Sequence, residues 1–174
     1  MSWVIAMSVA IVPITVEHVD GFREALDLVA RERKYLAMLE APPIEQVRAF
    51  VMNNIQNANP HLVMMDTNRV VGWCDIVRKN QAIHAHAGVL GMGIRPEYRG
   101  QGLGKHLLST ALAQAWHTLR RVELTVRADN SRAIALYENA GFIKEGEMRD
   151  AVRIDGIYTN LLLMAILGNA RREA

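Results

Sequence analysis

The stretch of the chain best suited to binding chemistry is a glycine-rich segment in its second half. It reads Arg99-Gly100-Gln101-Gly102-Leu103-Gly104-Lys105, with glycine at every second position. Glycine lets the backbone bend tightly and lets a ligand approach it closely. The apolar spacing that follows predicts a helix from about Gly102 to Leu119, whose first N–H groups and dipole favour an anion. With Arg95 and Lys105 adding positive charge, the segment predicts a pyrophosphate site.

Two common phosphate-binding patterns do not fit this segment. A P-loop needs a glycine five residues before its Gly-Lys pair and Ser or Thr after it, but Arg99 and His106 occupy those positions. The dinucleotide pattern needs a third glycine where Lys105 stands. Taken alone, the segment fits either a phosphate cradle for some other ligand or a glycine-rich turn without a binding role.

A second motif follows about 25 residues later, and the two motifs together indicate which ligand the glycine-rich segment binds. It runs from Asn130 to Tyr137 as Asn-Ser-Arg-Ala-Ile-Ala-Leu-Tyr and continues to Gly141-Phe142. Residues 99–104 match (Gln/Arg)-x-x-Gly-x-(Gly/Ala), and residues 130–142 match Asn-x-x-Ala-x-x-x-Tyr followed by Gly-Phe. In this order the two motifs resemble the signatures of the GNAT superfamily of acyl-CoA N-acyltransferases. The resemblance covers roughly residues 60–167, and the first 60 residues only in their helix count.

The resemblance implies an N-acetyltransferase that moves an acetyl group from acetyl-CoA to a primary amine by direct attack, without a metal. It implies that one strand before the loop splays from its neighbour and that the pantetheine arm fills the gap. The cofactor-binding residues that it implies are Met92, Gly93, Ile94, Arg99, Gly100, Gln101, Gly102, Leu103, Gly104, Lys105, Asn130 and Tyr137.

Tyr137 matches the tyrosine that serves as general acid for the departing thiolate in similar proteins. A phenol has an ordinary pKa of about 10, so it is protonated and can donate at neutral pH. A structural role for Tyr137 is also open, because it shares an apolar helical stripe with Ala133, Leu136 and Ala140 and could belong to the hydrophobic core. Asn130, which matches a cofactor-contacting asparagine, could also cap the helix.

The general base is predicted to be His86, because a histidine pKa near 6.5 suits the removal of a proton from an amine. His84 would lie on the same face if residues 82–94 form a regular strand. Glu32 and a water chain are alternatives. The resemblance places the acceptor between the first two helices and the last hairpin. The residues expected there are Glu32, Arg33, Tyr35, Glu40, Arg149, Arg153, Asp155 and Tyr158.

The acceptor itself is expected to be a small-molecule amine such as an amino acid, which could use one of these arginines, or a polyamine. Two alternatives remain: acetylation of a protein N-terminus, as in ribosomal-protein acetyltransferases, and a non-catalytic CoA-binding domain. The resemblance adds a homodimer as a candidate assembly.

Hydrophobic periodicity predicts the elements that must position these residues. The expected fold is α/β (α+β), a GNAT-like mixed, mostly antiparallel sheet of six to seven strands, with helices on both faces and a splayed central strand pair. Strands are expected near residues 10–15, 61–65, 70–77, 82–94, 122–126, 142–149 and 158–167. Helices are expected near 20–39, from Pro43 onward, near 102–119 and near 130–140.

Length and composition bound the remaining possibilities. The chain has 174 residues and a formal net charge of +2, which predicts one domain, 1–174, and neither a nucleic-acid nor a membrane partner. Its single cysteine, Cys74, lies in an apolar run and is expected to be buried and inert. The apolar N-terminus lacks a basic region and fits a first strand better than a signal peptide, so a cytoplasmic protein is expected.

Overall fold

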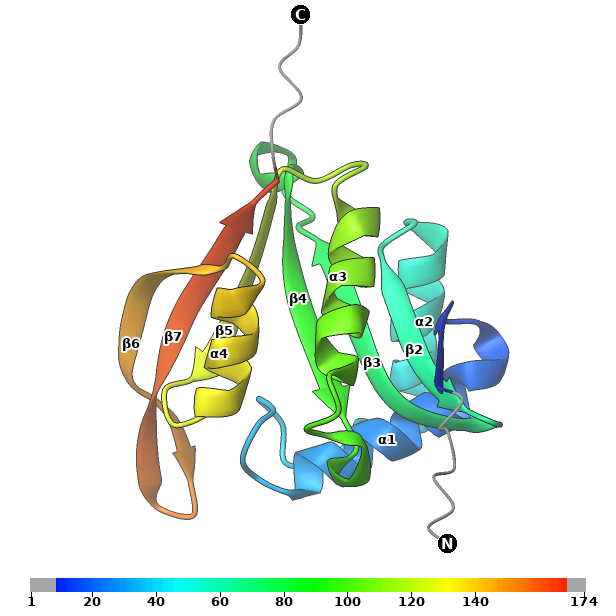
Figure 1. The fold of residues 1–174 in the computed structure, drawn as a ribbon, viewed down its shortest axis with the longest axis horizontal. Helices are drawn as coiled ribbons and strands as arrows, with labels where there is room; N and C mark the ends of the chain where they lie inside the picture. The colour runs from blue at the N-terminus through cyan, green and yellow to red at the C-terminus, as the bar shows by residue number, and fades with distance from the viewer. Residues whose placement is uncertain (1–8, 169–174) are drawn as a thin grey trace, which may run out of the picture.

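The computed structural model describes residues 9–168, which form a seven-stranded sheet with helices on both of its faces (Figure 1). The strands are β1 (Val9–Pro13), β2 (His61–Asp66), β3 (Arg69–Arg78), β4 (Ala87–Ile94), β5 (Arg121–Arg127), β6 (Ile143–Ile154) and β7 (Ile157–Leu167). The α-helices are α1 (Val19–Arg31), α2 (Ile44–Gln56), α3 (Leu103–Ala115) and α4 (Ser131–Asn139). Short 3-10 turns lie at Val16–His18, Ala82–His84 and Pro96–Tyr98.

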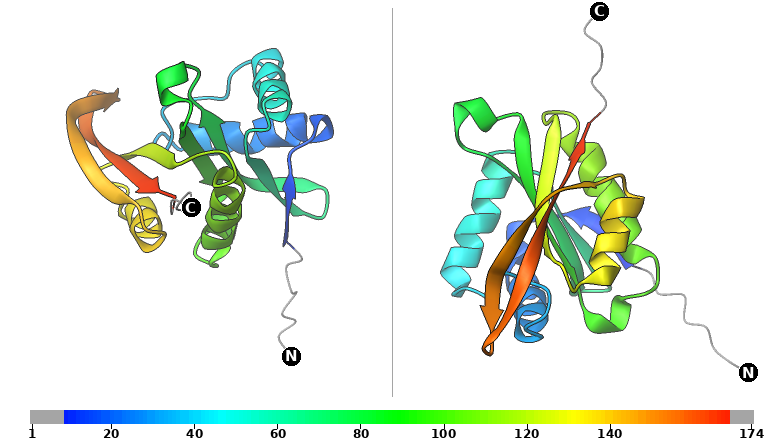
Figure 2. Two further views of the ribbon diagram at one scale, coloured as in Figure 1. Left: turned by 90° about the horizontal axis from the view of Figure 1, so that it is seen from above. Right: turned by 90° about the vertical axis from the view of Figure 1, so that its left-hand side faces the viewer.

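The strand order is β1-β2-β3-β4-β5-β7-β6, and among the described strands the β4–β5 pair alone is parallel. Helices α1 and α2 cover one face of the sheet, and α3 and α4 cover the other (Figure 2). The apolar stripe predicted for the third helix is confirmed, because Leu107, Leu108, Ala111, Leu112 and Ala115 of α3 are buried. These observations confirm the predicted mixed, mostly antiparallel fold.

The sheet divides between its two central strands. Strand β4 pairs with β3 along its length up to Ile94, and β5 pairs with β7 as far as Arg127. Between them, pairing stops after the register pair of Val89 and Glu123. Beyond these residues β4 and β5 diverge, as Figure 1 shows, and the predicted splayed strand pair is confirmed.

The first predicted helix is too long. The expectation of a helix over residues 20–39 is wrong at its end, because α1 stops at Arg31 and Arg33 takes a left-handed backbone with φ of 57°. Charged side chains beyond Arg31 find partners on distant elements instead of continuing the helix: Glu32 bonds Arg99, and Arg33 bonds Asp155. Residues 32–40, hereafter the 32–40 segment, therefore form an irregular connection that contacts the glycine loop at Arg99 and the last hairpin at Asp155.

The strand predicted over 82–94 begins only at Ala87. Strand β3 ends at Arg78, which pairs with Gly88, so the chain before Ala87 has no residue of β3 to pair with. It forms the 3-10 turn Ala82–His84 instead, and the expectation that His84 and His86 lie on this strand is wrong.

The N-terminal strand predicted near 10–15 is β1, and residues 1–8 of the same apolar stretch lie outside the described residues. Within residues 9–168, no helix combines the length and the apolar character that a membrane crossing requires.

Gly93 provides a test of the packing that holds β4 in place. A Cβ atom at this position would overlap the buried indole ring of Trp73 on β3. We expect Gly93→Ala to lower the free energy of unfolding by about 1–3 kcal/mol, the usual cost of overpacking. Gly146→Ala is the matched control, because no atom lies within 4 Å of the added Cβ there. Urea unfolding of both variants measures the difference, and equal stabilities would contradict this packing.

Candidate active site

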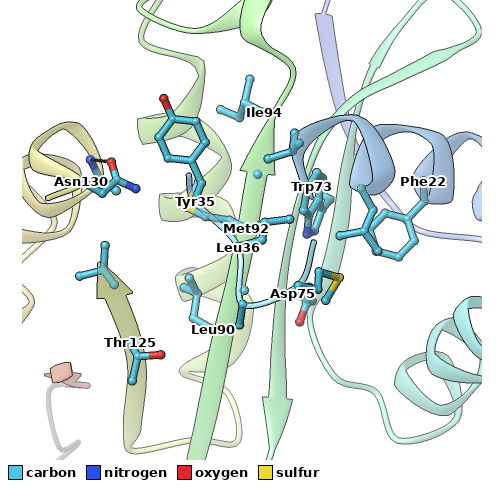
Figure 3. Close-up of a pocket in the computed structure, with 18 of the residues that line it drawn as sticks. Phe22, Tyr35, Leu36, Trp73, Asp75, Leu90, Met92, Ile94, Thr125 and Asn130 are labelled. Carbon is cyan, nitrogen blue, oxygen red and sulfur yellow. Dashed lines mark hydrogen bonds between the residues drawn. The ribbon is translucent and has the colours of Figure 1, made fainter. Parts of the chain in front are cut away.

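A cavity of about 560 Å³ lies where β4 and β5 diverge and continues between the sheet and helices α1 and α2. In Figure 3, Leu90 on β4 and Thr125 on β5 stand on either side of this opening, and Asp75 of β3 lies on the far side of β4 from Thr125. One wall comes from β4, β5 and α4. These lining residues are Leu90, Gly91, Met92, Gly93, Ile94, Thr125, Val126, Asn130, Arg132, Ala133, Leu136 and Tyr137. The other wall comes from α1, α2 and the 32–40 segment.

The structure brings together several of the residues predicted to hold the cofactor. Met92, Gly93 and Ile94 line the cavity from β4, and Asn130 and Tyr137 line it from α4. The side chain of Asn130 also accepts a hydrogen bond of 3.2 Å from the backbone N–H of Ala133, which confirms that it caps α4. Its side-chain amide group is left to face the cavity (Figure 3).

The glycine loop forms the entrance to α3. Gly100 and Gly102 have φ of 75° and 77°, a left-handed conformation that favours glycine, and no atom lies within 4 Å of a Cβ added at either position. Gly102 is the N-cap residue of α3, and no side chain caps this helix. Gln101 and Lys105 beside it are exposed and Leu103 and Gly104 are partly buried, and none of residues 100–105 is among those that line the cavity. Within the described residues, the first N–H groups of α3 therefore lack a side-chain cap, and that of Lys105 reaches the Gly102 carbonyl at 3.1 Å.

Two arginines predicted to surround a phosphate instead bond to other groups of the protein. Arg95 is completely buried: its Nε donates to the Val70 carbonyl at 2.8 Å and its Nη2 to Glu24 at 2.9 Å. Placing Arg95 at the phosphate is thus wrong. Arg99 lines the cavity, yet its Nη1 and Nη2 bond both carboxylate oxygens of Glu32, at 2.8 and 2.5 Å. Its positive charge is neutralised within the protein.

Tyr137 lies at the junction of the cavity and the core. It is 7% exposed, packs against Phe142 with ring centroids 5.6 Å apart and lines the cavity, so its core and cavity roles coincide. Burial, and to a smaller extent Cys74, raise the pKa of its hydroxyl well above the ordinary value. The phenol therefore stays protonated throughout the neutral range and can act as a donor.

Asp75 is the site residue that the sequence reasoning missed. It lies on β3 opposite Gly91 of β4, lines the cavity and is 8% exposed. Burial raises the pKa of its carboxyl from 3.8 to about 7. The signal was present in the sequence, since Asp75 is the one charged residue within the apolar run from Val70 to Val77. A carboxyl that titrates near pH 7 in a cavity is a candidate acid or base.

The residues expected to act as base lie elsewhere. His86 is exposed in the turn before β4, its backbone carbonyl accepts bonds from Arg120 and Arg121, and its side chain is not among those lining the cavity. His84 belongs to the preceding 3-10 turn and is also exposed. Glu32 is held by Arg99. Both of its carboxylate oxygens accept hydrogen bonds from the Arg99 guanidinium, so they are not free to accept a proton from an amine.

The last hairpin does not supply the side chains that were expected to line the acceptor site. Among the residues proposed for the acceptor, Tyr35 lines the cavity, whereas Arg149, Arg153, Asp155 and Tyr158 do not. Asp155 holds Arg33 through contacts of 2.6 and 3.0 Å, and so ties the hairpin to the 32–40 segment. The guanidinium of Arg153 stacks on Tyr158. The hairpin thus anchors the segment that covers the cavity.

Cys74 is buried, as predicted, and burial raises the pKa of its thiol. A thiol with a raised pKa is a poor nucleophile at neutral pH. Within residues 9–168, no three His, Cys, Asp or Glu side chains are grouped closely enough to hold a metal ion.

The comparisons with known proteins agree with this geometry. Residues 25–142 match the Acetyltransferase (GNAT) family, and the chain therefore belongs to it. The chain is 31% identical over 114 residues to the spermidine N(1)-acetyltransferase of Vibrio cholerae, covering 64% of this chain and 65% of that protein. It is 33% identical over 106 residues to the N-alpha-acetyltransferase RimI of Mycobacterium tuberculosis, covering 59% and 66%. The chain thus spans just under two thirds of the length of these relatives.

The fold also matches a solved structure across most of both chains. A Salmonella typhimurium protein, solved with its cofactor acetyl-CoA, superposes with a TM-score of 0.86. The match covers 92% of this chain and 94% of that one, at 16% sequence identity. At this level of identity the match establishes the shared fold.

The buried carboxyl of Asp75 predicts a pH-dependent stability difference. Its pKa is raised in the folded state, so the folded protein binds this proton more tightly, and stability is lost as pH rises from about 4 to about 7. Asn carries no charge at any pH. We expect Asp75→Asn to be nearly as stable as the wild type at pH 4.5 and more stable by roughly 2–4 kcal/mol at pH 8.

Chemical denaturation at a series of pH values measures this difference. Gly146→Ala, which changes no ionisable group and adds a Cβ that meets no atom within 4 Å, is the control and should differ from the wild type by a constant amount. A constant difference for Asp75→Asn as well would contradict an elevated carboxyl pKa.

Proposed function

We propose that this protein is an N-acetyltransferase that transfers an acetyl group from acetyl-CoA to a small primary amine. The observation that carries the proposal is the parting of β4 and β5, which opens a cavity containing Tyr137 and Asp75; the start of α3 adjoins its lining, because a Cβ at Gly104 would contact Ile94 and Leu136. The family membership, and the acetyl-CoA held by the Salmonella typhimurium protein of the same fold, support the choice of acyl donor.

Two features of the chain fit acetyl-CoA. From Leu90 to Ile94, the edge of β4 that faces β5 has no strand partner, so its backbone groups can pair with the amides of a pantetheine arm. The open space at Gly100 and Gly102 and the uncapped N–H groups of α3 suit a pyrophosphate. We propose that residues 100–105 and Asn130 hold the carrier, whereas Arg99 positions the loop through Glu32.

Asp75 is proposed as the general base in place of His86. A primary amine is largely protonated at neutral pH and must lose a proton before it can attack. With a pKa of about 7, Asp75 is ionised in a useful fraction of molecules and can accept that proton inside the cavity. The ionised carboxylate also attracts the incoming ammonium group, which combines binding and deprotonation in one side chain.

Tyr137 is proposed as the general acid. Acetyl-CoA supplies an activated acyl group when it is bound. The C–N bond to the amine forms and the C–S bond breaks, so a proton must reach the departing sulfur. The hydroxyl of Tyr137 has a raised pKa and retains its proton until that moment, and it lies on the helix that also carries Asn130. Holding both reactants beside these groups provides the remaining rate enhancement.

The 32–40 segment supports a small-molecule acceptor over a protein N-terminus. Ion pairs fix it on two sides: to the glycine loop through Glu32 and Arg99, and to the hairpin through Arg33 and Asp155. A segment held in this way covers the cavity and leaves less room for a protein chain to enter.

Release of free thiol from acetyl-CoA over a panel of amines and short peptides tests the activity. No release with any acceptor, together with intact CoA binding, would refute the proposal.

The proposed base predicts a change in the pH profile. We expect kcat/KM of the wild type to rise with pH and to level above about 7, because only ionised Asp75 accepts the proton. Asp75→Asn should remove this rise and lower kcat/KM by roughly 100-fold or more. Asp20→Asn should leave the profile unchanged. Retention of the rise in Asp75→Asn would assign it to another group and contradict the proposed base.

The proposed acid predicts a separation of binding from turnover. We expect Tyr137→Phe to lower kcat by roughly 100-fold, the lower end for loss of a proton donor, while CoA affinity stays within about twofold of wild type. Steady-state kinetics and calorimetric titration with CoA measure the two effects. Tyr158→Phe, on the exposed hairpin, is the matched control. An unchanged kcat in Tyr137→Phe would remove the phenol from the mechanism.

A further inference from the structure

The acceptor end of the cavity is strongly apolar. Asp75 and Gln46 apart, the side chains that line it from α1, α2, the 32–40 segment and β3 are aliphatic or aromatic, among them those of Phe22, Leu26, Leu36, Met38, Val47 and Trp73. Phe22 and Trp73 meet edge to face with ring centroids 5.7 Å apart, and both are almost fully buried. A hydrocarbon group placed there would exchange water for apolar contacts, which is favourable in proportion to the area covered.

Among all the residues that line the cavity, three carry charge: Asp75, Arg99 and Arg132. The charge of Arg99 is compensated by Glu32, which accepts from two of its five N–H groups; the Ile94 carbonyl accepts from a third at 2.8 Å, and the guanidinium lies over the Tyr35 ring. Arg132 belongs to the first turn of α4, on the opposite face of the sheet from α1 and α2. The acceptor end therefore contains one uncompensated charge, the carboxylate of Asp75.

This charge distribution discriminates between classes of amine. One ammonium group can pair with Asp75. The second ammonium group of a diamine or polyamine would have to lie among apolar side chains without a counter-ion, at a large desolvation cost. The carboxylate of a free amino acid would lie near Asp75, of like charge, with no free cation at this end of the cavity to hold it.

We propose that the acceptor is a primary amine with a single positive charge, an apolar substituent and no carboxylate. This inference rests on the proposed function and narrows its substrate class, in place of the amino acid or polyamine expected from the sequence. Asp75 binds the ammonium group, and the aromatic and aliphatic side chains between α1, α2 and the 32–40 segment hold the substituent.

Three matched amines test the proposal. 2-Phenylethylamine has the predicted character, L-phenylalanine adds a carboxylate to the same skeleton, and 1,4-diaminobutane has no ring and carries a second ammonium group at the end of a four-carbon chain. We expect kcat/KM for 2-phenylethylamine to exceed each of the other two at least tenfold. Calorimetric titration of the free protein, without acetyl-CoA, should give the same order of affinities. An equal or higher kcat/KM for either competitor would overturn the inference.

A charge placed in the cavity provides the reverse test. Met38 lies on the 32–40 segment, lines the acceptor end and is partly exposed, so Met38→Glu offers a second carboxylate with little disturbance of the core. We expect it to raise the preference for 1,4-diaminobutane over 2-phenylethylamine at least tenfold. Ile83→Glu is the matched control, on the exposed turn Ala82–His84 and outside the cavity lining. It should leave the preference unchanged.

The outcomes separate this inference from the proposed function. Thiol release with 1,4-diaminobutane or L-phenylalanine as the better acceptor would leave the acetyltransferase intact and overturn the inference alone. No thiol release with any amine would refute both. An equal change in preference in Met38→Glu and Ile83→Glu would show that overall charge, rather than the cavity, selects the amine, and would also overturn the inference.

Discussion

The divergence of β4 from β5 is the constraint on which the rest of this structure depends. Each strand is fully paired on its outer side, β4 with β3 and β5 with β7, so each follows its own half of the sheet. The two halves share register pairs only from Ala87 to Val89 and from Arg121 to Glu123. Beyond that point, unpaired backbone edges face one another across a space that no strand fills. Unpaired backbone groups must find partners. A ligand that contains amide groups satisfies that requirement, and the cavity, the glycine loop and α4 are arranged around the same space.

Ion pairs decide how the cavity is covered. Arg99, from the loop that precedes α3, holds Glu32 with two hydrogen bonds, and Asp155 of the hairpin holds Arg33. These contacts connect the proposed donor site to the wall of the acceptor site through a single segment. Because Arg99 is partly buried, its pair with Glu32 is screened less by solvent than an exposed pair. The same pairing neutralises Arg99, which lines the cavity, so the charge at the acceptor end is set by Asp75.

Burial acts on the two proposed catalytic groups in the same direction, with different chemical results. It raises the pKa of Tyr137, which keeps a phenol protonated that would already be protonated at neutral pH. It raises the pKa of Asp75 to about 7, which turns a carboxylate that would always be ionised into a group that can exchange a proton near neutrality. One low-dielectric environment thus provides a donor and an acceptor from two side chains of different intrinsic acidity.

The sequence by itself determined the local features: the amphipathic faces of α3 and α4, the glycine turn at Gly100 and Gly102, the Asn130 cap and the final hairpin. These depend on periodicity and turn chemistry within a few residues. Only the tertiary structure decided that α1 stops at Arg31, that β4 begins at Ala87, that Arg95 is buried against Glu24 and that Asp75 lines the cavity. Each of these depends on a partner far away in the chain, such as Glu32 for Arg99 or β3 for β4. A side chain's charge, burial and pKa are set by those distant partners, which is why motifs predict a glycine loop and a helix cap but do not predict which residues line the other end of the cavity.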